Sequence, residues 1–251
     1  MKSLILAFQF LTVFPIKKDM EPVPEELSGS MAWFPLVGAA QGLILVASDY
    51  LLSRLLPPGI VAGALVLILV LTNGGLHLDG FSDTVDGLAG GRTKEDRLRI
   101  MRDSSAGAIG VAFLIILILL KYLAIENIEQ GARGPALFVF PAVGRWAMVP
   151  MAYMSKYARA EGGLGAAFTG ISRPTLIKAT VIVAALSALA LGAFSLILIA
   201  VLWAVIYGFS RLFKRKLGGV TGDVFGFQSE IAEVLFLIMV LGLTNILGTA
   251  E

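Results

Sequence analysis

The sequence of 251 residues contains no cysteine and a single histidine, and only 15% of its residues are charged. The absence of cysteine excludes a disulfide framework, a thiolate metal site and a thiol nucleophile. The low charge content and a mean hydropathy of +0.85 exclude an ordinary soluble domain. A net charge of only +2 does not favour binding to nucleic acid. We therefore expect a polytopic membrane protein whose surface is largely solvated by lipid.

Apolar runs of about the length that crosses a bilayer occur seven times in the chain. They are Met31 to Leu56, Ile60 to His77, Ala108 to Ala124, Pro135 to Tyr153, Leu176 to Leu191, Phe194 to Phe209, and Ile231 to Leu247. The amino-terminal segment 1–30 holds a shorter apolar run without a small-residue cleavage site, so we expect a retained interfacial segment. The sequence thus predicts an all-α bundle of about seven transmembrane helices, forming a single membrane-embedded domain over residues 1–251.

The basic residues are distributed unevenly over the segments between these spans. Sixteen of the 20 lysines and arginines fall on the side of the amino terminus, whereas Arg54, Lys121 and Arg133 are expected on the opposite side. Cytoplasmic loops of membrane proteins are enriched in lysine and arginine. We therefore expect a cell (inner) membrane protein whose amino terminus is cytoplasmic. The two polar, glycine-rich segments 78–107 and 211–230, expected as loops, would then share the cytoplasmic side and could form one site.

The first of these segments carries three closely spaced aspartates in the stretch GGLHLDGFSDTVDGLAGGR at 74–92. If this stretch is helical, spacings of four and three place Asp79, Asp83 and Asp86 on one face. Three such carboxylates repel one another and need a proton, basic partners or a divalent cation. Oxygen ligands favour magnesium or manganese, which typically bridge carboxylates and phosphates. The alternative is a helix that simply ends at the water interface, but the many glycines argue against a plain solvated helix.

Other residues near this stretch are candidates for the same site. Arg92 precedes a capping box at Thr93 and Arg102 lies on the helix that the box opens. These arginines either bind substrate phosphates or belong to a solvated helix face. Asp103 is either a fourth metal ligand or an interface residue. The single histidine, His77, is either structural or a proton carrier.

The second polar segment reads KRKLGGVTGDVFGFQSEIAEV and contributes Thr221, Asp223 and Glu230 as candidates for substrate binding. Carboxylates that enter a membrane helix are energetically expensive, which points to function. Arg145 lies inside an expected span and either pairs with one of these carboxylates or contacts a substrate phosphate.

Five motifs give the chain its resemblance to a known family. They are FLTVFP at 10–15, FPLVGAAQG at 34–42, GGLHLDGFSDTVDGLAGG at 74–91, RIMRDSSAGAIG at 99–110, and GGVTGD with the later glutamates at 218–233. In these motifs the sequence resembles the cobalamin synthase family, the adenosylcobinamide-GDP ribazoletransferases, over nearly its whole length.

The resemblance implies a magnesium-dependent transferase of cobalamin biosynthesis. Its substrates would be GDP-cobinamide and alpha-ribazole, its products adenosylcobalamin and GMP, and its cofactor Mg2+. Asp79, Asp83, Asp86 and Asp103 match the acidic motif of the family, and we expect Asp83 or His77 to accept the hydroxyl proton. Expected partners, besides the lipid bilayer, are a second copy of the chain or other enzymes of cobalamin assembly.

Two other functions fit parts of the sequence. A CDP-alcohol phosphotransferase of lipid synthesis would explain DTVDGLAGGR, but a downstream pair of aspartates is missing. An ion-coupled transporter would explain the carboxylates in membrane spans, but the three aspartates lie at a span end and no internal repeat is present.

Overall fold

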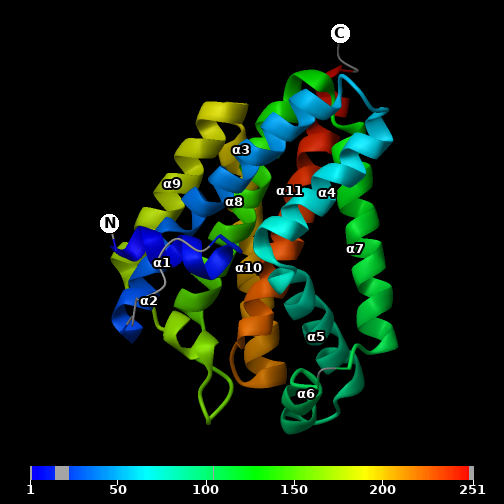
Figure 1. The fold of residues 1–251 in the computed structure, drawn as a ribbon. Helices are drawn as coiled ribbons and strands as arrows, with labels where there is room; N and C mark the ends of the chain where they lie inside the picture. The colour runs from blue at the N-terminus through cyan, green and yellow to red at the C-terminus, as the bar shows by residue number, and fades with distance from the viewer. Residues whose placement is uncertain (1, 15–22, 104, 249–251) are drawn as a thin grey trace.

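The computed structural model describes residues 2–14, 23–103 and 105–248, which fold into a bundle of α-helices (Figure 1). The helices are α1 Lys2–Leu11, α2 Pro24–Ser30, α3 Phe34–Leu52, α4 Pro58–Asn73, α5 Leu76–Gly90, α6 Lys94–Ile100, α7 Ala108–Asn127, α8 Gln130–Met154, α9 Arg173–Leu191, α10 Ser195–Leu217 and α11 Gly222–Gly248. Two 3-10 helices, η1 Met31–Trp33 and η2 Leu164–Phe168, complete the described elements.

Six of the continuous helical stretches are long and apolar enough to cross a membrane. They are α2–η1–α3 taken together, α7, α8, α9, α10 and α11, and the bent pair α4–α5 supplies the seventh crossing. The predicted all-α membrane fold with about seven spans is therefore confirmed. Helix α1 is too short to span, and it buries Leu6, Ala7 and Leu11 against the bundle.

The second span is broken, which the sequence analysis did not predict. Helices α4 and α5 meet at an angle of 91° at Gly74 and Gly75, whose φ angles are 65° and 75°. Only glycine adopts this left-handed conformation at little cost. The Asn73 side chain accepts a hydrogen bond of 2.9 Å from the Gly75 N–H, which stabilises the turn. The expected continuous span from Ile60 to His77 was therefore wrong at its end, and the three aspartates lie on a separate helix.

The two polar segments expected as loops are mostly helical. Segment 78–107 contains most of α5 and all of α6, and in segment 211–230 only residues 218–221 separate α10 from α11. Several of the glycines lie within these helices where another backbone or side chain packs closely against the helix. Both segments lie at one end of the bundle, at the bottom of Figure 1, together with the connection between α8 and α9.

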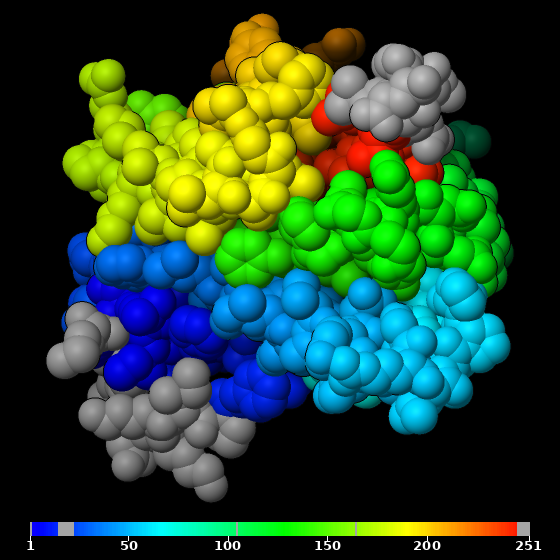
Figure 2. Space-filling view, turned by 90° about the horizontal axis from the view of Figure 1, so that it is seen from above, coloured from blue at the N-terminus to red at the C-terminus, as the bar shows by residue number. Residues whose placement is uncertain are grey.

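Helix α8 forms the centre of the bundle and packs mainly against α3, α11 and α9. At the end opposite the polar segments, the green turn between α7 and α8 lies between blue and cyan α3–α4 and yellow α9 (Figure 2). Helix α3 approaches α8 closely because two glycines, Gly38 and Gly42, face the backbone of residues 138–142. A β-carbon at either glycine would collide with a carbonyl oxygen of α8, from Pro141 or Phe138.

We expect Gly42→Ala to destabilise the protein by about 1–3 kcal/mol, because the added methyl group overpacks the contact between α3 and α8. The measurement is thermal unfolding of the purified protein in detergent. Gly208→Ala on α10 is the matched control, since a β-carbon there meets no atom within 4 Å. A melting temperature of Gly42→Ala equal to that of the control would show that α3 and α8 are not in backbone contact.

Candidate active site

Helices α5 and α11 touch through two glycines at the end of the bundle that carries the polar segments. A β-carbon built on Gly80 would lie 2.7 Å from the Asp223 carbonyl oxygen, and one on Gly226 would lie 2.9 Å from that of His77. Only the absence of side chains at these positions allows the two backbones to approach so closely. The contact brings Asp79 and Asp83 of α5 next to Asp223 of α11.

These carboxylates form a group of like charges, which we call the carboxylate group: Asp79, Asp83 and Asp223. Asp83 is half-buried and lies within electrostatic reach of Asp79, Asp223 and Asp86. The opposing charge that reaches Asp83 is Arg159. Negative charge thus accumulates where two helices meet, which is the condition that attracts a cation or a basic group.

Asp86 is oriented differently from the other two aspartates of α5. Its carboxylate accepts hydrogen bonds from the backbone N–H of Gly107, at 2.9 Å, and of Gly110, at 2.7 Å. These N–H groups belong to the start of α7, where unpaired donors and the helix dipole favour a negative charge. Asp86 therefore ties α5 to α7, in addition to any role it has as a ligand.

Asp223 is held by neighbours on two segments. Arg159 donates to its carboxylate at 2.9 Å, and the Thr221 hydroxyl donates to the same carboxylate at 3.1 Å. The Thr221 hydroxyl oxygen also accepts from the backbone N–H of Val224 at 3.3 Å, as in a helix cap. Thr221 and Asp223, both predicted from the sequence, thus lie beside the carboxylate group.

Arg159 reaches this position through a short backbone pairing. The Val220 N–H donates to the Lys156 carbonyl at 2.9 Å, and the Ala158 N–H donates to the Val220 carbonyl at 2.9 Å. The chain between α8 and α9 is thereby fixed beside the start of α11. Arg159 is a site residue that could not be predicted from the sequence, because only this long-range pairing places it next to Asp223.

A cavity of about 480 Å³ opens beside the carboxylate group. Its lining includes Asp79, Asp223 and Arg159 together with apolar and aromatic side chains from α1, α5, α8 and α11. His77 also lines it and is only 2% exposed, and among the described residues neither of its ring nitrogens has a hydrogen-bond partner.

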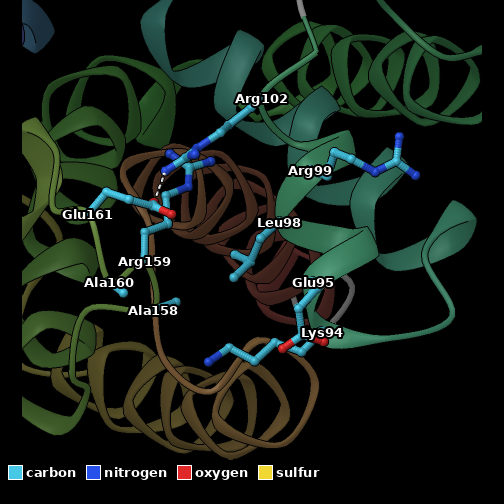
Figure 3. Close-up of a pocket in the computed structure, with 9 residues that line it drawn as sticks. All are labelled: Lys94, Glu95, Leu98, Arg99, Arg102, Ala158, Arg159, Ala160 and Glu161. Carbon is cyan, nitrogen blue, oxygen red and sulfur yellow. Dashed lines mark hydrogen bonds and ion pairs between the residues drawn. The ribbon is translucent and has the colours of Figure 1, made fainter.

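A second, basic pocket of about 320 Å³ also has Arg159 in its lining (Figure 3). Helix α6 contributes Lys94 and Arg99 to it, and Arg102, which follows α6, forms an ion pair of 2.6 Å with Glu161. Arg159 lines both the cavity and the basic pocket. A substrate with phosphates could therefore contact the basic pocket and the carboxylate group at once.

Behind the site lies a buried network of charges between three spans. Lys121 of α7 pairs with Glu230 and Glu233 of α11, at 2.6 Å each, and Arg145 of α8 pairs with Glu233 at 2.7 Å. Arg145 also donates to Ser229 and Gln41, at 2.7 and 3.1 Å. Two cations thus balance two carboxylates away from water, as buried charges require. This arrangement favours a structural role for Arg145 and Glu230 over a contact with substrate.

The location of Lys121 differs from the one expected from the distribution of basic residues. This lysine was counted among the basic residues on the side of the membrane opposite the amino terminus, but it is buried within α7. A lysine within a long apolar helix is itself a sign of a buried partner. That rule could have identified Lys121 from the sequence.

Arg92 and Asp103 were also predicted as site residues, and both are exposed. Arg92 follows the end of α5. The Asp103 carboxylate accepts hydrogen bonds from the hydroxyl and the backbone N–H of Ser105, which hold its pKa below the ordinary value. Its contacts thus differ from those of the other three aspartates.

The donor set of the carboxylate group fits magnesium in its chemistry. Among the described residues, no group of three or more histidine, aspartate or glutamate side chains is arranged as a ready metal site. Magnesium, however, usually takes only one or two protein carboxylates and completes its shell with water and substrate phosphates. Asp79, Asp83 and Asp223 offer such oxygen ligands beside a pocket suited to phosphate.

Comparisons with known proteins decide the family. The family model of cobalamin-5-phosphate synthases matches residues 3–241. The chain belongs to this family. The resemblance inferred from the sequence motifs is therefore confirmed. No solved structure matches the chain.

Curated relatives are similar over almost their full length. An adenosylcobinamide-GDP ribazoletransferase of Geotalea daltonii is 39% identical over 95% of this chain and 96% of its own length. Proteins of the same name from Syntrophobacter fumaroxidans and Desulforamulus reducens are 37% and 36% identical. They cover 92% and 94% of this chain, and 94% and 96% of their own lengths.

We expect Lys121→Met to lower the free energy of unfolding by about 3–5 kcal/mol, because it leaves buried carboxylates without their main partner. Thermal unfolding in detergent measures the loss, and Lys214→Met, at an exposed lysine of α10, is the control. Adding Glu230→Gln to Lys121→Met should restore part of the stability. A loss no larger than that of Lys214→Met would contradict the buried network.

Proposed function

We propose that the chain joins GDP-activated adenosylcobinamide to alpha-ribazole and releases GMP. The observation that carries this proposal is the carboxylate group, assembled from α5 and α11 beside a basic pocket, in a member of the cobalamin-5-phosphate synthase family. The names of the relatives, adenosylcobinamide-GDP ribazoletransferase, support the choice of substrates. They favour this activity over lipid synthesis or ion-coupled transport.

The reaction is a transfer between two oxygens at one phosphorus. A ribose hydroxyl oxygen of alpha-ribazole forms a bond to the phosphorus attached to cobinamide. The bond from that phosphorus to the bridging oxygen of the pyrophosphate breaks, and GMP leaves with this oxygen. The hydroxyl proton passes to a base, for which we propose Asp83, with His77 on the cavity wall as the second candidate. Catalysis then consists mainly of positioning and charge stabilisation.

The chain supplies these two effects from different places. Lys94, Arg99 and Arg102 would bind the phosphates of the donor nucleotide, and Arg159 would contact them from between the two pockets. We propose that Asp79, Asp83 and Asp223 hold Mg2+, which when bound neutralises charge on the pyrophosphate. Asp86 positions α5 against α7 through the N–H groups of Gly107 and Gly110.

We further propose that the end of the bundle with α6 and residues 155–172 faces the cytoplasm of a cell whose inner membrane holds the protein. The concentration of lysine and arginine at this end supports the orientation. Nucleotide-activated substrates are available on that side.

We expect Asp83→Asn to lower turnover by about 10²–10⁴-fold while leaving the melting temperature close to that of the wild type, because Asp83 is half-buried and makes its main interactions with other charges. The assay measures GMP release and the corrinoid product by mass spectrometry at saturating Mg2+. Because the family description names a cobalamin 5-phosphate, both alpha-ribazole and its 5′-phosphate should be offered as acceptors.

Two other variants make this test specific. Glu25→Gln, at an exposed position of α2, should keep full activity. Asp86→Asn should lose both activity and stability, since it also weakens the contact with α7. If Asp83→Asn retained most of the wild-type rate, Asp83 would be neither an essential ligand nor the base.

A further inference from the structure

We propose that the cavity beside the carboxylate group is the binding site of the acceptor nucleoside, and that the donor binds outside it. This inference rests on the proposed function and specifies where each substrate binds. The cavity is lined by residues of α1, α5, α8, α11 and the chain that follows α8.

Size is the first argument. Sites for small organic ligands measure about 300–1,000 Å³, and the cavity of about 480 Å³ falls within this range. A nucleoside with a bicyclic base fits such a volume. The donor carries a corrin ring with its amide side chains, an adenosyl group and a guanosine diphosphate, and is far too large for it.

The lining is the second argument. Phe10, Leu76, Met148, Tyr157 and Phe225 form an apolar and partly aromatic surface. Flat aromatic bases pack favourably against such side chains. The same cavity also exposes the polar groups of Asp79, Asp223 and Arg159, which suit ribose hydroxyls. An apolar base with a polar sugar has this combination of surfaces.

His77 is the third argument. It is 2% exposed, lines the cavity, and within the described part of the chain has no hydrogen-bond partner at either ring nitrogen. Buried polar groups in proteins are nearly always hydrogen-bonded, and an exception needs an explanation. A nucleoside in the cavity would offer hydroxyl and ring-nitrogen partners for His77.

The position of Arg159 is the fourth argument. It lines both the cavity and the basic pocket. With the acceptor in the cavity and the phosphates of the donor at the basic pocket, the attacking hydroxyl and the pyrophosphate would meet at Arg159 and the carboxylate group. Reversing the two substrates would put the donor where it does not fit.

Gly222 provides a direct test of the cavity. It begins α11, lines the cavity, is not among the glycines with positive φ, and a β-carbon there meets no atom within 4 Å. Gly222→Leu should therefore fill part of the cavity without straining the backbone. Gly208→Leu on α10 is the matched control, because its β-carbon also meets open space and Gly208 does not line the cavity.

The experiment measures KM for each substrate with the purified full-length protein in detergent, and binding of alpha-ribazole alone by calorimetry. We expect Gly222→Leu to raise KM for alpha-ribazole about tenfold or more, as steric changes in such pockets do, and to weaken its binding. KM for GDP-cobinamide should stay unchanged, as should both values in Gly208→Leu. Should Gly222→Leu fail to fold, Leu76→Trp, at a cavity residue that is 47% exposed, provides the same test.

The outcomes separate this inference from the proposed function. A raised KM for GDP-cobinamide alone, an equal rise for both substrates, or no change in either would overturn the assignment of the cavity. Wild-type protein that releases no GMP from the two substrates would overturn the proposed function itself.

Discussion

The backbone contact between α5 and α11 is the constraint on which the site depends. Gly80 and Gly226 let the two helices approach so closely that the carboxylates of one helix lie beside Asp223 of the other. A side chain at either glycine would separate the helices and the carboxylate group with them. Glycine is costly within a helix, so its presence here reflects the need for contact rather than for flexibility.

The break in the second span is what makes this contact geometrically accessible. If α4 continued straight, the aspartates would lie along the axis of α4. The 91° bend at Gly74 and Gly75 instead turns α5 away from that axis. Interrupted helices in membrane proteins are tolerated where they are buried in protein or line a polar cavity. The buried network of Lys121, Glu230, Glu233 and Arg145 then fixes α7, α8 and α11 behind the site with balanced charges.

The fold could be predicted largely from the sequence, because a helix that crosses a lipid bilayer must be long and apolar, and such runs can be recognised in a single sequence. The distribution of lysines and arginines also placed both polar segments on one side, and the structure brings them to one end of the bundle. The spacing of the aspartates identified Asp79 and Asp83 correctly as neighbours on a helix. These signals are local or additive, so a single sequence contains them.

The missed features depend on tertiary contacts. Arg159 is beside Asp223 only because the chain after α8 pairs with Val220, and no local sequence pattern predicts such a pairing. Gly74 and Gly75 are evident in the sequence, but two glycines in an apolar run do not show whether the helix bends or continues. The partners of Arg145 were left open because a buried arginine fits a carboxylate and a phosphate equally well.

The central claim is that Asp83 on α5 and Asp223 on α11 belong to one catalytic site. A double-mutant cycle tests it most directly, with the rate of GMP release measured for Asp83→Asn, Asp223→Asn and the double variant. We expect the double variant to be no slower than the slower single variant, because residues that act as a unit are strongly non-additive. Losses that multiply would show two independent sites and would contradict the claim.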